Sequence, residues 1–397
     1  MEDAARRSAL MTLRIAIDAR HIQDFGIGSY IRNLLAALNQ VGQANEYFVV
    51  SRPGDDGLFP ALGPNFRFVS YSHSDSERLD HFAFPAFLRG LRASLYHMPL
   101  SDVPFWMPDP YVVTIHDMSR QLYMVATGFR KQLSFYRARR GLMRARKVIA
   151  VSAATRRDAE SLLGIPVQHI RMIHNAPDFR FSEPRDAVAA ASAETERKRV
   201  LERYQISLPF ILYAGSIRPH KNIPRLIEAF AVLRGQLSSH PAFADLRLVV
   251  IGDEISKHSE VRLAASQSRV AQAVRFLGFI PFETLRVFYE SAACFAFPSL
   301  NEGFGLPPLE AMACGAPVLA SNVSSLPEVL GDAAMLVSPE KVFEIANGLK
   351  ELLLNEGLRA TLIERGYQKV KEFNWLRTAS EVLETYQEAM RSPRPRW

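Results

Sequence analysis

The feature that most constrains the fold is an alternation of strand-like and helix-like runs, which stops partway along the chain and then starts again. Apolar runs of strand length occur at 13–18 and 111–115, and helical periodicity occurs between such runs, as at 29–38. The alternation ends near Asp178 and resumes at Phe210. Because alternating strands and helices build parallel sheets with helices on both faces, the restart predicts two α/β lobes.

The break between the lobes is visible in the composition. Residues 182–202 are rich in alanine, glutamate and arginine and carry few apolar side chains, which is typical of a linker that is helical in part. We therefore predict a first lobe at 1–180, a linker at 181–206 and a second lobe at 207–376. The C-terminal helix, 377–397, is a candidate to pack back on the first lobe. Open α/β sheets bind ligands at the carboxyl ends of their strands, so we expect the site in a cleft between the lobes.

Composition also excludes several classes of protein. The two cysteines, Cys294 and Cys314, lie in apolar surroundings, so we interpret them as small buried side chains rather than a disulfide. The apolar runs are of strand length, well short of the roughly 20 residues that span a bilayer. Residues 1–11 lack the apolar core of a secretion signal. We therefore expect a cytoplasmic protein.

Much of the positive charge is concentrated in one segment, 130–147. Its cations are Arg130, Lys131, Arg137, Arg139, Arg140, Arg144, Arg146 and Lys147. Apolar and aromatic side chains lie between them, so a helix here is a candidate for contact with an anionic membrane surface, which would place the protein at the inner membrane face. An ordinary solvated helix face is the alternative. No nucleic-acid-binding module is recognisable, so we expect no nucleic-acid partner.

The most specific motif is the string at 301–318, which follows a strand-like run and continues into a helix. Pro307 and Pro308 suit the first turn of that helix, where a missing N–H costs nothing. Gly303 and Gly305 allow the backbone to come close to a ligand, and amides at the helix start favour an anion. The segment is therefore a candidate binding loop for a negatively charged ligand.

Two carboxylates of this string, Glu302 in the loop and Glu310 about two turns into the helix, could contact opposite ends of one extended ligand. The string resembles the E-x7-E signature of family 4 glycosyltransferases, whose fold is GT-B: α/β, with two Rossmann-like parallel-sheet lobes facing across a cleft. The resemblance implies that Glu302 lies by the donor sugar and that Glu310 binds the ribose hydroxyls. It further implies that the backbone amides of the loop face the sugar and the diphosphate. These positions are Gly303, Phe304, Gly305 and Leu306.

A second loop, 215–222, follows the first strand-like run of the second lobe. Cations there could neutralise a diphosphate leaving group as its charge develops. The loop resembles the family's G-R-x-x-x-x-K motif, which implies that Lys221 binds the diphosphate. Ser216 stands where many members have arginine, and Arg218 is the candidate replacement. Family members with serine or threonine at that point are often mannosyltransferases.

Two motifs of the first lobe complete the set. His116 follows the run at 111–115 and resembles the family's histidine near the hydroxymethyl group of the donor sugar. A core histidine with satisfied hydrogen bonds is the alternative, and Asp117 would either orient His116 or cap the next turn. Gly28 lies in a loop at 25–30 that resembles the family's N-terminal glycine loop, which lets acceptor and diphosphate approach a helix start.

These resemblances imply a retaining hexosyltransferase in which His116, Glu302 and Lys221 are catalytic. The family reaction is front-face attack, in which the departing diphosphate helps to deprotonate the acceptor hydroxyl. The predicted donor is GDP-mannose, with a UDP-sugar as the alternative. The predicted acceptor is a glycan or lipid-linked molecule in surface polysaccharide, O-antigen or lipid-linked glycan synthesis.

Two rival functions and the cofactor complete the sequence predictions. The chain has no D-x-D triplet and no cluster of cysteine and histidine, so we expect neither a metal nor another cofactor. A sugar phosphorylase or epimerase of the same fold is one rival. A non-catalytic subunit that only binds a glycan is the other, and it predicts loss of Glu302, Lys221 or His116. All three are present.

Overall fold

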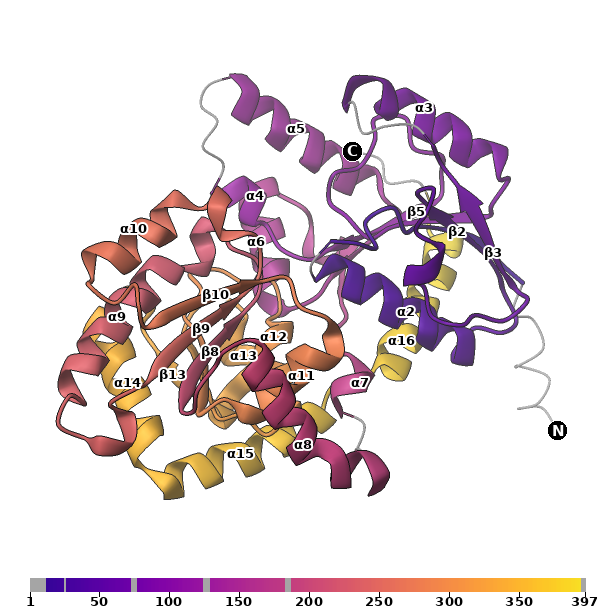
Figure 1. Cartoon of the computed structure of the whole chain (residues 1–397). Helices are drawn as coiled ribbons and strands as arrows, with labels where there is room; N and C mark the ends of the chain where they lie inside the picture. The colour runs from indigo at the N-terminus through magenta and orange to yellow at the C-terminus, as the bar shows by residue number, and fades with distance from the viewer. Residues whose placement is uncertain (1–11, 25, 73–76, 124–128, 183–186, 394–397) are drawn as a thin grey trace. The chain divides into compact units, whose positions relative to one another are not determined.

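The chain forms two compact units (Figure 1). The computed structural model describes residues 12–24, 26–72, 77–123, 129–182 and 187–393. The first unit comprises Met1–Asn175 and Trp375–Trp397, and the second comprises Ala176–Asn374. Each unit is built on a parallel sheet with helices, as the alternating pattern predicts.

The first unit contains a seven-stranded parallel sheet in the order β3-β2-β1-β4-β5-β6-β7. The strands are β1 (Arg14–Asp18), β2 (Glu46–Ser51), β3 (Phe66–Ser70), β4 (Leu95–Met98), β5 (Tyr111–Ile115), β6 (Lys147–Ala150) and β7 (Ile170–Met172). The strand order reverses between β1 and β4, which pair in register at Ile15 and Leu95. In open sheets such a reversal opens a crevice at the carboxyl ends of the strands.

Helices cover both faces of this sheet. They are α2 (Ile27–Val41), α3 (Glu77–Gly90), α4 (Ser119–Leu122), α5 (Phe129–Arg144), α6 (Ala153–Leu163) and α16 (Trp375–Arg391). Figure 1 shows α2 and α16 together on one side of the sheet and α3 and α5 on the other. Leu88 of α3 and Leu142 of α5 belong to one buried cluster with the strands. The C-terminal helix α16 thus packs against α2 within the first unit.

The second unit repeats this plan with a six-stranded parallel sheet in the order β10-β9-β8-β11-β12-β13. The strands are β8 (Phe210–Ala214), β9 (Arg247–Ile251), β10 (Val274–Gly278), β11 (Cys294–Phe297), β12 (Val318–Ser321) and β13 (Met335–Val337). The helices are α7 (Phe179–Ser182), α8 (Ala187–Arg203), α9 (Ile223–Gln236), α10 (Ser259–Gln267), α11 (Phe282–Ser291), α12 (Leu306–Ala313), α13 (Leu326–Leu330), α14 (Val342–Leu354) and α15 (Glu356–Lys371). Here the strand order reverses between β8 and β11.

The segment 181–206, predicted as a linker, is part of the second unit. Most of it is helix α8, which belongs to the second unit and packs against α11. Among the side chains of α8 that the structure describes, the buried apolar ones lie near its end and include Val200 and Leu201. That narrow apolar face explains why the composition of the segment is typical of a linker although the chain is helical there.

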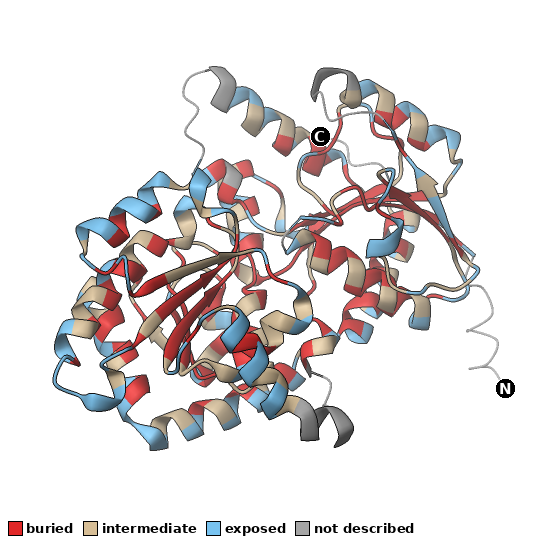
Figure 2. Ribbon diagram, viewed as in Figure 1, coloured by how far each residue is buried: buried red, intermediate tan, exposed pale blue. Residues whose placement is uncertain are grey.

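The strands form the core of each unit, and Figure 2 shows their buried residues as red arrows. Both cysteines are free: Cys294 is buried in β11 and Cys314 is half-buried at the end of α12. Within the described ranges, no helix is long and apolar enough to cross a bilayer.

Candidate active site

Lys221 and Glu302, both predicted as catalytic, form an ion pair in the second unit. Lys221 Nζ lies 2.6 Å from Glu302 Oε1, and the two side chains are 14% and 9% exposed. Lys221 ends a short 3-10 turn after β8, and Glu302 lies in the loop after β11. Because β8 and β11 are the strands between which the order reverses, the pair marks the crevice where open α/β sheets bind ligands.

Hydrogen bonds hold the backbone around this pair. Asn222 Nδ2 donates to the carbonyl of Pro298 over 3.0 Å and so joins the loop after β8 to the end of β11. Ser324 Oγ accepts from Glu302 N at 3.2 Å and donates to Glu302 O at 2.7 Å, and Ser325 Oγ donates to the same carbonyl. The main chain of Glu302 is therefore fixed, and its carboxylate is held by Lys221.

The loop 303–306 presents backbone rather than side chains. All four residues are buried, and Phe304 packs edge-on against Phe373 with ring centres 5.4 Å apart. Gly305 has a φ of +97°, and a Cβ there would lie 2.6 Å from the Leu326 side chain, so only glycine fits. Helix α12 begins directly after this glycine, which places the loop amides at a helix N-terminus suited to an anion.

Glu310, predicted to bind the ribose, lies on α12 and has a partner that the sequence did not reveal. Tyr289 of α11 donates its hydroxyl to Glu310 Oε2 over 3.2 Å. Tyr289 is buried, and burial together with the nearby carboxylate raises its pKa well above the ordinary value, so it stays a donor. The tyrosine therefore orients one carboxylate oxygen of Glu310.

Replacing Tyr289 with phenylalanine should raise the Kd for the nucleoside diphosphate about two- to tenfold, because one orienting hydrogen bond contributes about 0.5–1.5 kcal/mol. Glu310→Ala should weaken binding further, about ten- to hundredfold, because it removes charge-assisted hydrogen bonds to the ligand. Calorimetric titration measures both. Tyr204→Phe, at the end of α8, is the control and should leave the Kd unchanged. An unchanged Kd in Glu310→Ala would exclude this residue from the nucleotide site.

Arg218, the candidate replacement for the missing arginine, is exposed at the start of the turn that contains Lys221. No ion pair to it is found among the described residues. The loop around it is fixed, because Ile217 N donates to Asp253 Oδ2 over 2.8 Å and Tyr213 donates to Ser216 O over 2.9 Å. Its guanidinium is thus available for a ligand, and its role as a diphosphate ligand stays a prediction.

His116 lies at the carboxyl end of β5 in the first unit, with its ring edge-on to Tyr30 at 4.6 Å. Burial lowers the pKa of His116 to about 4, so the ring is neutral at pH 7. One ring nitrogen bonds the carbonyl of Pro99 and therefore carries the proton. Nε2 is buried with no hydrogen-bond partner among the described residues. This nitrogen can accept a hydrogen bond, and the contact of His116 with the donor sugar stays a prediction.

His97 is a core histidine of this unit with both ring nitrogens hydrogen-bonded, and the sequence did not single it out. Its Nδ1 bonds the hydroxyl of Tyr386 at 2.7 Å and its Nε2 bonds Thr114 Oγ1 at 2.8 Å. Tyr30 joins the same network through Thr114 Oγ1 at 3.1 Å. The network ties α16 and α2 to the sheet beneath His116. Asp117, whose role was open, accepts from the N–H of Ser119, the first residue of α4, at 2.8 Å, and its charge also acts on His116.

These two histidines should make the protein less stable in mild acid. Burial lowers the pKa of His97 to about 3 and that of His116 to about 4, against about 6.5 in the unfolded chain. Below about pH 6.5 the unfolded state binds protons that the folded state does not, so the free energy of unfolding falls as pH falls. The slope is at most about 1.4 kcal/mol per pH unit for each histidine.

Urea unfolding between pH 7.5 and 4.5 measures this dependence. His116→Asn should reduce the slope, whereas His240→Asn, at an exposed position, should not. Equal slopes in all three proteins would show that His116 titrates normally in the folded state.

Gly28 lies in the first turn of α2, close to the preceding loop. Its N–H donates to Asp24 O over 2.8 Å, and a Cβ built on it would lie 2.1 Å from the carbonyl oxygen of Ile22. The glycine is therefore required by the packing of its own loop against the helix start. Its predicted contact with the diphosphate or acceptor stays a prediction.

The basic segment 130–147 divides between internal contacts and open surface. Arg146 pairs with Asp109 through bonds of 2.8 and 2.6 Å, and Lys147 Nζ lies 3.4 Å from a carboxylate oxygen of Glu388. These two cations, which follow the end of α5, are used inside their own unit.

The cations on α5 itself behave differently. Arg139 donates to the carbonyl of Leu163 at 2.9 Å, and Arg140 donates to that of Phe105 at 2.8 Å. Cations of α5 with no ion pair or hydrogen bond among the described residues are Arg137 and Arg144. The side chains of Arg130 and Lys131 lie outside the described ones. Fewer cations are therefore open to a membrane than the sequence count suggests.

In the described part of the chain, a metal ion would need several side chains that could bind it together. No three His, Cys, Asp or Glu side chains gather there as a group that could hold an ion. The groups that surround the Lys221 site are a lysine, backbone amides and single carboxylates.

Two family models match the chain. Residues 26–180 match the model described as Glycosyltransferase Family 4, and residues 197–369 match the one described as Glycosyl transferases group 1. Together the matched residues cover most of the chain, and each match falls mainly within one of the two units.

The curated relatives are glycosyltransferases, and the solved structures share the fold of this chain. The chain is 29% identical to O-antigen chain mannosyltransferase B of Escherichia coli over 305 residues. The aligned region covers 75% of each chain. It is 30% identical to serotype-specific mannosyltransferase WbdA of Escherichia coli over 301 residues. This aligned region covers 74% of this chain but only 35% of WbdA. Sucrose-phosphate synthase of Thermosynechococcus elongatus superposes with a TM-score of 0.74 at 22% identity, over 95% of this chain and 98% of that one. Anabaena HepE, solved with UDP-glucose, superposes with a TM-score of 0.74 at 16% identity, over 94% and 99%.

Proposed function

The chain belongs to the glycosyltransferases of family 4 and group 1, and on this premise we propose that it moves a hexose from a nucleotide-sugar to an acceptor hydroxyl with retention at the anomeric carbon. The observation that carries the proposal is the Lys221–Glu302 pair between β8 and β11, beside the N-terminus of α12. A cation, a row of backbone amides and a carboxylate gather there, which suits the diphosphate and sugar of one donor.

In the proposed reaction the protein stabilises charge and positions the reactants. The bond between the anomeric carbon and a diphosphate oxygen breaks, and the bond to the acceptor oxygen forms on the same face. Lys221 and the amides of 303–306 stabilise the negative charge that develops on the diphosphate. The departing diphosphate takes the proton of the acceptor hydroxyl, so the step needs no separate base.

The remaining residues hold the donor. Glu310, oriented by Tyr289, accepts hydrogen bonds from the ribose hydroxyls. Once Lys221 pairs with the diphosphate, the Glu302 carboxylate accepts a hydrogen bond from a hydroxyl of the sugar. His116 offers a buried acceptor nitrogen to the hydroxymethyl group of the sugar. Each of these contacts is directional, so together they would hold the donor in one orientation for attack.

We propose GDP-mannose as the donor and an acceptor glycan, free or lipid-linked, of surface polysaccharide or O-antigen type. The mannosyltransferases among the relatives and Ser216 in the Lys221 loop support this donor. A UDP-sugar is the second candidate, since HepE of the same fold was solved with UDP-glucose.

A donor panel tests the proposal. Purified protein is incubated with GDP-mannose, UDP-glucose and ADP-glucose with and without a mannan-type oligosaccharide, and free nucleoside diphosphate is measured. Fastest release from GDP-mannose, with a product whose anomeric proton matches the α configuration of the donor, supports it. Faster turnover of a UDP-sugar would show that GDP-mannose is not the donor. A product with the inverted anomeric configuration would overturn retention. Nucleotide binding without turnover would favour the non-catalytic glycan-binding subunit.

Activity should not depend on a divalent cation. Lys221 and the start of α12 supply the positive charge that a metal ion supplies to the diphosphate in other enzymes. Transfer should therefore keep its rate within about twofold in excess EDTA. Loss of activity in EDTA that Mn²⁺ or Mg²⁺ restores would contradict this.

Peripheral contact with the inner membrane face is the last part of the proposal. Arg137 and Arg144, together with exposed Leu133 and Tyr136, give α5 a basic and partly apolar surface. Each cation near an anionic bilayer contributes about 1 kcal/mol, so binding should be weak and salt-sensitive. Co-sedimentation with phosphatidylglycerol vesicles, but not with phosphatidylcholine vesicles, supports it, and binding to neither overturns it.

A further inference from the structure

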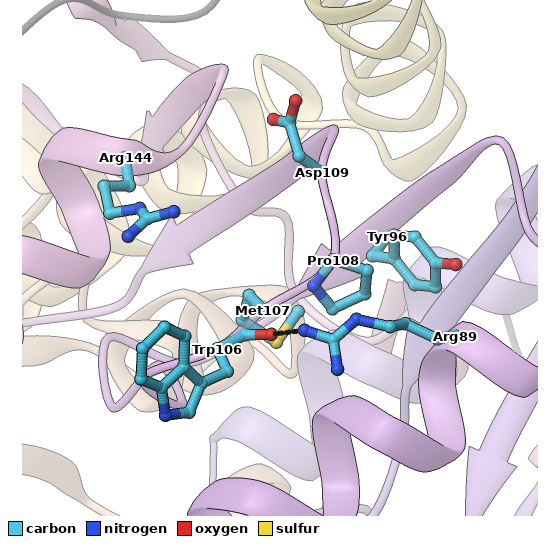
Figure 3. Close-up of a pocket in the computed structure, with 7 residues that line it drawn as sticks. All are labelled: Arg89, Tyr96, Trp106, Met107, Pro108, Asp109 and Arg144. Atoms are coloured by element: carbon cyan, nitrogen blue, oxygen red, sulfur yellow. Dashed lines mark hydrogen bonds between the residues drawn. The ribbon is translucent and has the colours of Figure 1, made fainter.

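The first unit contains a pocket of about 420 Å³ that the proposed reaction does not use (Figure 3). Its lining residues are Arg89, Tyr96, Trp106, Met107, Pro108, Asp109 and Arg144. They come from the end of α3, from β4, from the segment between β4 and β5, and from the end of α5. Asp109 stands before the first residue of β5, whereas His116 follows its last. The pocket therefore lies toward the amino ends of the strands, whereas His116 lies at their carboxyl ends.

The charge of the pocket is positive. Arg144 is exposed and has no acidic partner among the described residues. Arg89 donates to the carbonyl of Trp106 at 2.5 Å and, likewise within the described ranges, has no carboxylate partner. The one acid of the lining, Asp109, is neutralised by Arg146 through two hydrogen bonds. In Figure 3 the Arg89 guanidinium lies beside the Pro108 ring, Arg144 lies farther from it on the side of Trp106, and the Asp109 carboxylate points away from Arg89.

The rest of the wall is apolar and aromatic. The Trp106 side chain is 49% exposed, and Met107 and Pro108 follow it along the chain. An indole face and a proline ring offer contact to the carbon atoms of a small ligand while the arginines hold its charge.

The segment that carries this wall is anchored before any ligand binds. The Arg140 guanidinium lies 3.8 Å from the centre of the Phe105 ring and also donates to the Phe105 carbonyl. Gly141 of α5 approaches so closely that a Cβ there would lie 2.7 Å from Val103. Because the segment is fixed on α5, little ordering is needed on binding.

We propose that this pocket binds a phosphate ester, with the phosphate between Arg89 and Arg144 and the esterified carbons against Trp106 and Pro108. Guanidinium groups bind phosphate oxygens with paired hydrogen bonds, and two unpaired cations match a group that carries one to two negative charges. The ester could belong to a free phosphorylated metabolite or to a phospholipid headgroup. The proposal stands apart from the sugar-transfer site and does not depend on it.

Binding is measured with two probes on the full chain: sn-glycerol 3-phosphate in solution, with glycerol as the uncharged control, and phosphatidylglycerol vesicles, with phosphatidylcholine as theirs. The variants are Arg144→Gln, Arg89→Gln and, as a matched loss of one positive charge on α5 outside the pocket, Arg137→Gln. Arg144→Gln and Arg89→Gln should each weaken binding of glycerol 3-phosphate at least tenfold, and Arg137→Gln less than twofold. On the vesicles Arg137→Gln should cost about fivefold, because it removes one of the α5 cations near the bilayer, and Arg144→Gln and Arg89→Gln should each cost more than that.

The outcomes are distinct. Saturable binding of glycerol 3-phosphate with this variant pattern supports a soluble ligand, and the same pattern with phosphatidylglycerol vesicles alone supports a lipid headgroup. Equal weakening by Arg137→Gln and Arg144→Gln would show diffuse attraction to α5 and overturn the pocket. No saturable binding of either probe would overturn it too. Trp106→Phe should abolish any ligand-induced change in tryptophan fluorescence, and a change that persists would place the ligand elsewhere.

Discussion

Replacing Lys221 with alanine should lower kcat for sugar transfer about 10²- to 10³-fold. The Lys221 ammonium lies 2.6 Å from Glu302 at the reversal point of the second sheet, 14% exposed, so its charge is poorly screened by water. If the diphosphate takes this place, the lysine stabilises charge that grows as the glycosidic bond breaks. Its removal should therefore affect kcat more than the KM for the donor.

The control must separate lost catalysis from lost stability. Truncating one partner of a largely buried pair leaves Glu302 without its cation, which lowers the free energy of unfolding. Lys221→Ala combined with Glu302→Gln removes that unpaired charge and should regain stability without regaining activity. Lys257→Ala, at an exposed lysine of the same unit, should change neither. If Lys221→Ala keeps kcat within tenfold of the parent, the leaving-group role is wrong.

The fold could be predicted from the sequence because buried parallel strands are continuous apolar runs. The runs at 13–18 and 111–115 coincide with β1 and β5 to within one residue, and the restart at Phe210 coincides with β8. The segment 181–206 could not be assigned in the same way. Over the part of α8 whose side chains are described, Val200 and Leu201 are the buried apolar residues, too few for a helical periodicity to stand out in the sequence.

The site could be predicted where its residues belong to a contiguous motif, and not where they act through a distant partner. Glu302 and Glu310 lie in one string, but the tyrosine that orients Glu310 is 21 residues away on another helix. Tyr386 and His97 are separated by 289 residues along the chain. Nothing local to either residue indicates the other, because only the packing of α16 on the sheet brings them together.

Replacing Gly28 with alanine is expected to be the most damaging small change in the first unit. The added Cβ would lie 2.1 Å from the carbonyl oxygen of Ile22 and 2.8 Å from its carbonyl carbon, far inside ordinary contact. The helix start or the loop must therefore shift by roughly 1 Å to restore van der Waals separation, and a displacement of that size costs about 10²-fold in rate at an active site.

The loop that contains Ile22 is poorly able to move aside. Ile22 is fully buried, and its carbonyl oxygen also accepts from Arg32 Nη1 at 2.9 Å. Ahead of it, buried Arg20 bonds Asp18 through two hydrogen bonds of 2.9 and 3.0 Å. The strain should therefore appear both as about 1–3 kcal/mol lost from the free energy of unfolding and as a shift of the helix start.

Urea unfolding and kcat/KM for the donor are measured together for Gly28→Ala. Gly90→Ala is the matched control, because that glycine has an ordinary φ and a Cβ on it meets nothing within 4 Å. We expect Gly28→Ala to be less stable and about 10²-fold less active, with Gly90→Ala unchanged in activity. Lower stability with full activity would show that the α2 start does not take part in donor or acceptor binding. Unchanged stability and activity would show that the loop yields, and that the close contact of Gly28 with Ile22 constrains nothing.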